Sequence, residues 1–369
     1  MFCFQCEQAA GGKGCTGTAG FCGKKASTAE LQDKLIGALI GLARAAEGNE
    51  DMVSSSTDKA VLEGLMSAVA DADIDDETIT ALIAQAQEEK RRLVPNCFFC
   101  ASPCGRTNNY DMQELWTADE DIRSLKSLIL FGIGGIAPYA CNALVLGRSD
   151  KDVNEFFYKA LFAIGMNYGI NELLPIVSEV GEVSLKCMAL PDKADNEASI
   201  LPAADKIAKA VREGTIKHIF LIDLCDTAIP DSCCCTEFVK QTPDHSIVLT
   251  LACEKYRFTG LGLGNVGGLP RIMEIGPCND AYSDVKVVMT LAEAFKCSVS
   301  DLPLSAVLFW HGQNAVCNLL TLLHLGIKNI LLGPSLPAFI SPNVLDLLGE
   351  NHNIAAITTP EEDLRRILG

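Results

Sequence analysis

Residues 218–253 read HIFLIDLCDTAIPDSCCCTEFVKQTPDHSIVLTLAC, and an apolar run lies at each end of this stretch. The runs HIFLID (218–223) and SIVLTLA (246–252) are short and continuous, which is typical of strands buried on both faces of a sheet. A cysteine follows each run, Cys225 after the first and Cys253 after the second. The stretch therefore predicts two buried strands, each with a thiol just beyond its carboxyl end.

Strand and helix patterns continue to alternate from this stretch to the C-terminus. We predict further strands at 306–310, 329–334 and 354–358, with helices at 203–213, 284–296, 314–326, 341–348 and 360–368. This alternation predicts a parallel sheet covered by helices on both faces, and ligands bind such sheets at the carboxyl ends of the strands. His311 also follows a predicted strand, so we expect Cys225, Cys253 and His311 at one edge of the sheet.

The part of the chain before this sheet has helical periodicity. Apolar spacing predicts two groups of about three helices, at 27–48, 57–70, 76–94, 120–147, 151–167 and 170–191. A polar linker, DKADNEASILP, occupies residues 192–202. We therefore predict an α plus α/β fold, with N-terminal helical bundles in residues 1–195 and a Rossmann-like parallel-sheet domain in residues 196–369.

Length and composition describe a soluble globular protein. The 369 residues are 49% hydrophobic and 21% charged, which suits two or three domains with full cores. The formal net charge of −17 argues against nucleic acid and anionic membranes as partners. We find no signal-peptide pattern and no apolar span long enough to cross a membrane. Seventeen thiols need a reducing compartment, so we expect a cytoplasmic protein of an anaerobe.

Four cysteines lie in the first 22 residues, as Cys3, Cys6, Cys15 and Cys22 with C-x2-C-x8-C-x6-C spacing. Glycines separate these thiols, so the loop can fold back and direct several sulfurs at one centre. Four thiolates in a short glycine-rich loop favour a [4Fe–4S] cluster. A zinc site is the competing interpretation, and disulfides are the third. The reducing compartment and the adjacent Cys-Cys-Cys later in the chain argue against a disulfide framework.

Several long stretches of this chain resemble the hybrid cluster protein family, whose members are also known as hydroxylamine reductases. The resemblance rests on MFCFQCEQ at the N-terminus, on helical segments such as FFYKALFAIG, and on FLIDLCD, LTLACEKYRF and GPCNDAYS in the second half. It covers nearly all of the chain. It implies a [4Fe–4S] cluster on the four N-terminal cysteines and a second cluster in the sheet domain. Cys225 then matches the family's persulfide-bearing cysteine, and Cys253 and Cys278 match two further cluster ligands.

The chain also departs from the family pattern. Typical members have a middle α/β domain that supplies a histidine, a glutamate and a cysteine to the hybrid cluster, and here DKADNEAS runs almost directly into LPAADKIAKAVREG. The family motif W-[FY]-E-Q-K-A, with its ligand glutamate and neighbouring lysine, reads Trp310-His311-Gly312-Gln313-Asn314-Ala315. We therefore expect this chain to lack the middle domain and part of the hybrid-cluster ligand set.

New cysteines lie near the second predicted site. Cys233, Cys234 and Cys235 are adjacent, and Cys317 follows Asn314 by three residues. Thiolates favour iron–sulfur clusters, so we predict a remodelled second cluster of unknown nuclearity on Cys225, Cys253, Cys278 and at least one of the adjacent three. In an extended chain Cys233 and Cys235 share a side and Cys234 faces the opposite side, so one or two of them would reach iron. The alternative is a decayed site with buried or reactive thiols.

Three weaker candidates complete the set. Cys97, Cys100 and Cys104 form C-x2-C-x3-C in a loop, which fits either a further metal site or a structural loop that carries thiols. His311 and Cys317 are candidates for metal binding or, for the histidine, proton relay. We assign no catalytic residue.

These features favour an oxidoreductase of an unspecified small molecule, with reduction of hydroxylamine or nitric oxide weak or lost. The alternative is a non-catalytic electron carrier or redox sensor with two closed clusters, and a cluster-assembly role is the third hypothesis. An electron donor of ferredoxin or rubredoxin type is the expected partner. Because the missing domain would leave a face of the last domain uncovered, we also expect a homo-oligomer.

Overall fold

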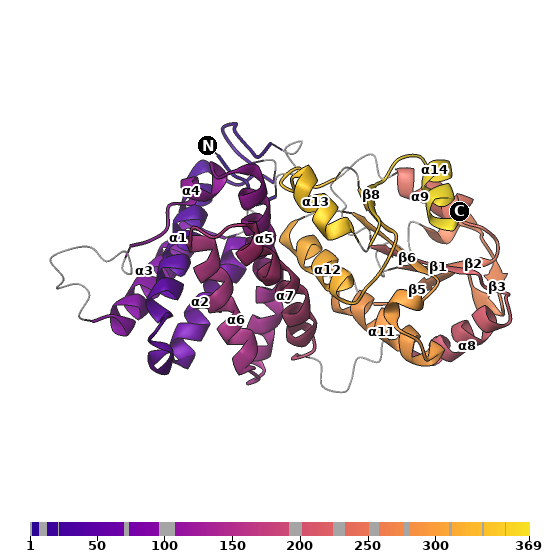
Figure 1. The fold of residues 1–369 in the computed structure, drawn as a ribbon, viewed down its shortest axis with the longest axis horizontal. Coiled ribbons are helices and arrows are strands. Elements are labelled where there is room, and N and C mark those ends of the chain that lie inside the picture. The colour runs from indigo at the N-terminus through magenta and orange to yellow at the C-terminus, as the bar shows by residue number, and fades with distance from the viewer. Residues whose placement is uncertain are drawn as a thin grey trace. The chain divides into compact units, whose positions relative to one another are not determined.

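The computed structural model describes residues 2–6, 13–20, 22–69, 74–95, 108–191, 201–223, 233–250, 258–276, 281–309, 312–333, 336–350 and 352–369. The chain divides into two compact units (Figure 1). The helical unit contains Met1–Lys193, Gly312–Leu320 and Ala338–Val344, and the sheet unit contains Ala194–His311, Thr321–Pro337 and Leu345–Gly369. Two segments that the sequence analysis assigned to the C-terminal domain thus belong to the helical unit.

Seven α-helices are described before the linker: α1 (Ala26–Ala46), α2 (Ser55–Val69), α3 (Asp76–Leu93), α4 (Met112–Trp116), α5 (Glu120–Val145), α6 (Lys151–Gly165) and α7 (Ile170–Met188). Six of them confirm the predicted helices to within a few residues. The short α4 was not predicted, since one turn shows no periodicity. The two predicted groups share one core, because α2 packs on α5 and α1 packs on α6.

Helix α5 corrects one expectation from the sequence. It has the length and the hydropathy of a membrane-crossing helix, although 67% of its most apolar window is buried inside the protein. Leu125, Leu128 and Ile133 have no exposed surface. A buried helix of this kind is typical of the centre of a helical core. The apolar span therefore exists, and its residues contact other helices of the unit.

Helix α12 (Gly312–His324) begins in the helical unit, against α5. A Cβ atom on Gly135 of α5 would lie 2.6 Å from Cys317 Cβ and 2.6 Å from the carbonyl oxygen of Gln313. Only glycine permits this approach, because real Cβ atoms do not come so close to other heavy atoms. This close packing explains why Gly312–Leu320 joins the helical unit although a strand of the sheet unit precedes it in the sequence.

The sheet unit is built on six parallel strands: β1 (His218–Asp223), β2 (Ser246–Thr250), β5 (Ile272–Glu274), β6 (Leu304–Phe309), β7 (Ile330–Gly333) and β8 (Ile354–Ala356). Their order across the sheet is β5-β2-β1-β6-β7-β8. Counted in sequence, this is 3-2-1-4-5-6, the order of the Rossmann fold. The predicted fold class is therefore confirmed.

Helices accompany these strands: α8 (Leu201–Arg212), α9 (Cys233–Gln241), α11 (Ala281–Phe295), α13 (Pro342–Gly349) and α14 (Pro360–Leu368). Helix α8 packs on α11, and α9 packs on α14. Phe220 of β1 and Phe238 of α9 meet edge to face in a buried cluster, with ring centroids 5.5 Å apart. Helix α9 and strand β5 were not predicted, and neither was the small hairpin of β3 (Asn265–Val266) and β4 (Leu269–Pro270).

Candidate metal centre

The N-terminal cysteine loop is closed by backbone pairing between two of its candidate ligands. Cys3 and Cys15 form an antiparallel bridge, in which each backbone N–H donates to the other residue's carbonyl oxygen at 3.0 and 2.8 Å. Gly14 makes this possible with a φ of +75°, and a Cβ there would lie 2.9 Å from the Cys3 carbonyl oxygen. The loop therefore folds back and pairs the backbones of two cysteines, while the predicted convergence of several sulfurs on one centre stays a prediction.

The four N-terminal thiols have different surroundings. Cys3 and Cys15 are buried, Cys6 is partly buried and Cys22 is exposed. Burial raises the pKa of the Cys3 thiol, and a hydrogen bond with the backbone of Gln5 acts in the opposite direction. A thiol that binds metal must lose its proton, so this hydrogen bond favours the form of Cys3 that a metal needs.

This donor set fits an iron–sulfur cluster by its chemistry, because all four candidates are cysteines on one short loop. Among the residues that the structure describes, no three Cys, His, Asp or Glu side chains lie close enough together to hold a metal ion. All four cysteines are described residues, and the backbone bridge joins Cys3 with Cys15; residues 7–12 and 21 of the loop lie outside the described residues. The complete four-cysteine ligand set thus stays a prediction.

Side chains from three elements hold the loop in place. Phe2 and Phe4 pack against Trp116 of α4, with ring centroids 6.3 and 5.0 Å from the indole. Gln5 accepts a hydrogen bond of 2.7 Å from the amide of Gln313 on α12. The Gln5 amide in turn donates to Asp33 of α1 at 3.5 Å. The loop is therefore attached to the first turn of α12 as well as to the N-terminal helices.

Asp33 is an ionisable group that the sequence analysis did not single out. Burial raises the pKa of its carboxyl to about 6, and the hydrogen bond from Gln5 opposes this change. The sequence signals for Gln5 and Gln313 were present, because they stand inside the two motifs MFCFQCEQ and Trp310–Ala315. No such signal marks Asp33, since an isolated aspartate on a helix is usually solvated.

The second set of candidate ligands follows the strands of the sheet in the sequence. Strands β5, β2, β1 and β6 are consecutive neighbours and parallel, so their carboxyl ends meet at one edge. The residues that follow these ends in the sequence are, in the same spatial order, Cys278, Cys253, Cys225 and His311. Strand order reverses between β1 and β6, and such a switch point is where open α/β sheets bind ligands. The predicted placement of the strand ends is thus confirmed.

The ligand side chains themselves are beyond what the structure describes. Cys225, Cys253, Cys278, His311 and the group Cys97, Cys100 and Cys104 lie outside the described residues. Cys233, Cys234 and Cys235 form the first turn of α9. The alternation expected for an extended chain was therefore wrong, because consecutive residues in a helix are rotated by about 100°. These cysteines remain predicted ligands.

Cys317 is a buried residue of the helical unit. Its thiol donates to the hydroxyl of Ser184 on α7 at 3.6 Å, and it is only 1% exposed. Cys187 on the same helix points its thiol at the carbonyl oxygen of Ile136, 3.9 Å away. Burial raises the pKa of Cys187, and the neighbouring Cys317 adds to this effect. Cys317 therefore packs between α12 and its neighbours α5 and α7. Its role as a metal ligand stays a prediction.

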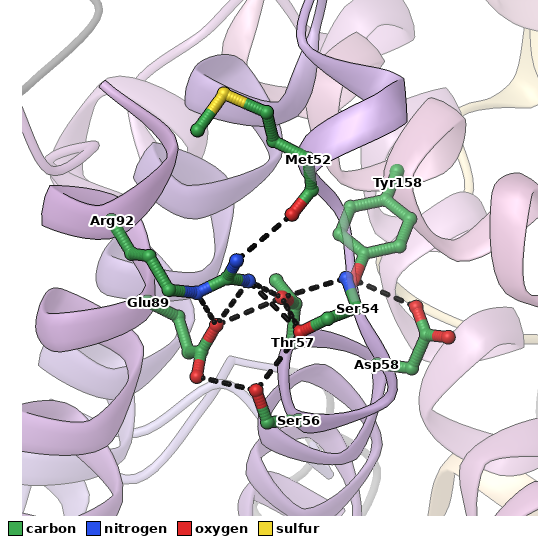
Figure 2. Close-up of polar contacts among 8 residues, drawn as sticks. All are labelled: Met52, Ser54, Ser56, Thr57, Asp58, Glu89, Arg92 and Tyr158. Carbon is green, nitrogen blue, oxygen red and sulfur yellow. Dashed lines mark hydrogen bonds and ion pairs between the residues drawn. The ribbon is translucent and has the colours of Figure 1, made fainter. Parts of the chain in front are cut away.

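A separate polar network and pocket occupy another part of the helical unit. Figure 2 shows Arg92 of α3 bonded to Met52, Ser54, Thr57 and Glu89 around the start of α2. Beside it, Tyr158 and Asn154 of α6 each donate to Asp58 at 2.9 Å. These three residues line a pocket of about 700 Å³, and burial raises the pKa of Asp58. None of the candidate metal ligands lines this pocket.

Comparison with known proteins decides the family. The chain matches the model of the Prismane/CO dehydrogenase family over residues 1–206 and again over residues 197–365. The chain belongs to this family. The family match and the relatives' names confirm the predicted resemblance and support an iron–sulfur or related metal-cluster oxidoreductase. The two matches meet at the linker, where the sequence analysis expected the middle domain to be absent.

Curated relatives match over their whole length. The hydroxylamine reductase of Moorella thermoacetica is 35% identical over 429 residues, and that of Methanocella arvoryzae is 31% identical over 544 residues. Each alignment covers 100% of this chain and 100% of the relative. Because this chain has 369 residues, the longer relative contains long stretches with no counterpart here, in agreement with the predicted loss of a domain.

One solved structure shows a more distant similarity. Carbon monoxide dehydrogenase IV from Carboxydothermus hydrogenoformans is 13% identical to this chain. The superposition covers 96% of this chain and 89% of that chain, with a TM-score of 0.37.

Proposed function

We propose that this chain is a two-centre iron–sulfur oxidoreductase. In this proposal Cys3, Cys6, Cys15 and Cys22 hold a [4Fe–4S] cluster. A second cluster binds at the sheet edge through Cys225, Cys253 and Cys278, with at least one cysteine of the first turn of α9. Bound clusters would supply one-electron transfer at both places. The protein's own residues supply the thiolates, the hydrogen bonds to them and the burial that tunes them.

The order of the strands is the observation that carries this proposal. Four neighbouring parallel strands end at the same edge of the sheet, and each is followed in the sequence by a candidate ligand; β1 and β6, which flank the switch point, are two of these strands. Thiolates at the first turn of a helix are also stabilised, because the backbone N–H groups there carry partial positive charge.

Iron and sulfide counts test the two centres. Anaerobically purified protein is expected to contain two clusters per chain, seen as two paramagnetic signals when the protein is titrated with a reductant. Replacement of Cys253 by serine is expected to remove only the sheet-edge signal. Cys297→Ser is the matched control, because Cys297 follows α11 and is not a candidate ligand. Wild-type protein with a single cluster that survives Cys253→Ser would contradict the second centre.

Hydroxylamine is the first substrate to assay, because the curated relatives are named hydroxylamine reductases. We propose that turnover here is lower than in those relatives by about a hundredfold or more, the usual effect of losing a positioned acid–base group. The reason lies in Gly312 and Asn314, which replace the glutamate and lysine of the family motif. An anaerobic assay with a reduced dye measures this, and turnover equal to that of a longer relative would contradict it.

The same two replacements favour a second candidate function. Thiolates that occupy vacated positions would close the iron to substrate, and the protein would then carry or sense electrons. Electron exchange with a reduced ferredoxin but no reduction of hydroxylamine or nitric oxide would favour this alternative. The proposed partner in either case is a small one-electron donor protein, and the proposed assembly is a homo-oligomer in the cytoplasm.

A further inference from the structure

Two buried glutamines connect the N-terminal loop with the start of α12. Gln313 Nε2 donates to Gln5 Oε1 at 2.7 Å, and the two residues are 5% and 6% exposed. Gln5 Nε2 then donates to Asp33 Oδ1 at 3.5 Å. The three side chains therefore form one directed chain of hydrogen bonds, from α12 through the loop to α1.

Gln5 has a second contact that bears on the metal centre. It stands between Cys3 and Cys6 in the sequence, and its backbone hydrogen-bonds to Cys3. Hydrogen bonds to ligand sulfurs are among the main determinants of the reduction potential of an iron–sulfur cluster. A movement of Gln5 would therefore change the surroundings of the Cys3 sulfur, even though the Gln5 side chain points away to Gln313.

Gln313 is held in place by its backbone. Its carbonyl oxygen packs against Gly135 of α5, so closely that a Cβ on Gly135 would lie 2.6 Å away. It also follows His311 by two residues, in the segment where this chain replaces the glutamate and lysine of the family motif but retains the glutamine. The donor that orients Gln5 thus belongs to the same short segment as a candidate ligand of the sheet-edge centre.

We propose that Gln5 and Gln313 are positioning residues, whose hydrogen bond holds the Gln5 backbone against the Cys3 sulfur and so sets the reduction potential of the N-terminal cluster. This inference rests on the proposed function, because it requires a cluster on the N-terminal cysteines. It adds a physical link, within the helical unit, between that cluster and the first turn of α12.

A double-mutant cycle tests the link. Gln5→Met, Gln313→Met and the double variant keep the shape of the side chains and remove the amides. The midpoint potential of the N-terminal cluster is measured by paramagnetic resonance during a redox titration, and the signal is identified by its loss in Cys6→Ser. Gln113→Met on α4 is the control, because Gln113 is exposed and lies in the same unit.

The proposal expects each single variant to shift the potential in the same direction, and the double variant to shift it no further than one of them. It is overturned if the iron content is retained and the potential is unchanged, or if the two shifts add. If a variant loses iron, Gln313→His, which restores an N–H donor, is expected to recover both iron and potential, and failure to recover them overturns the proposal. Absence of any signal that depends on Cys6 in the wild type would instead contradict the proposed function.

Discussion

In the N-terminal loop, contacts between distant residues hold the candidate ligands, whereas at the sheet edge the strand order is enough to bring the strand ends together. The loop depends on the Cys3–Cys15 bridge, on the contacts of Phe2 and Phe4 with Trp116, and on a hydrogen bond from Gln313, 308 residues away. The sheet edge depends on four parallel neighbours. A site of the first kind is sensitive to remote substitutions, and a site of the second kind tolerates changes in its loops.

The largest expected effect separates the two centres directly. Cys6→Ser is expected to remove about one cluster's iron and to weaken the loop, because metal binding supplies folding energy where few apolar residues do. The sheet unit is expected to keep its own iron. Iron and sulfide per chain measure both outcomes. Full retention of iron in Cys6→Ser would show that the loop does not carry a cluster.

The next largest effect is expected from the contact between α5 and α12, and it shows whether this contact supports the N-terminal loop. Gly135→Ala is expected to lower the free energy of unfolding by about 1–3 kcal/mol, since the new methyl group overlaps Cys317 and the backbone of Gln313. It is also expected to shift the potential of the N-terminal cluster. Thermal unfolding and a redox titration measure the two effects. Gly349→Ala is the control, because no atom lies within 4 Å of the new methyl group.

Mild acid is expected to weaken the sheet unit. Burial lowers the pKa of His218 on β1 to about 4, and the ring contacts Ser305 of β6 at 3.0 Å. In the unfolded chain the His218 imidazole takes up a proton near pH 6.5, whereas in the folded chain it does so only near pH 4. The contribution of His218 to the free energy of unfolding is therefore fully present above about pH 6.5 and is lost as the pH falls toward 4. Between about pH 7.5 and pH 5.5 the loss is about 1 kcal/mol.

The matched variant for this effect is His218→Gln, which cannot bind the proton. Its thermal midpoint is expected to fall less than that of the wild type over the same range of pH. Equal pH dependence in the two proteins would show that His218 is not the group responsible.

The smallest effect concerns the network of Figure 2, which lies in the helical unit but does not include the cysteine loop. Arg92→Met removes hydrogen bonds of 3.0 Å to the Met52 carbonyl and 2.8 Å to Glu89. Since the Arg92 side chain is 41% exposed, the expected loss is about 1 kcal/mol, with no change in iron content. Arg91→Met is expected to change the thermal midpoint less, because Arg91 and its partner Glu88 are more exposed.

Local sequence patterns predicted the individual helices and strands better than they predicted which segments belong to which unit. Apolar periodicity predicted α1, α5 and α7, and continuous apolar runs predicted β1 and β2, because both signals come from neighbours in the sequence. The short β5 and the helix α9 were missed. Strand β5 has three partly exposed residues, and α9 begins with three cysteines that have no helical pattern.

Residue patterns alone were enough to predict the family, the two sets of cysteines and a parallel sheet in which a cysteine follows β1 and another follows β2 in the sequence. The packing of the first half of α12 with the N-terminal helices, and the hydrogen bond from Gln313 to Gln5, became known from the folded chain. The reason is physical. Periodicity and spacing record which face of an element is apolar, whereas the choice of partner depends on the shape of a distant surface. Here that surface includes Gly135, whose missing side chain lets α12 approach α5.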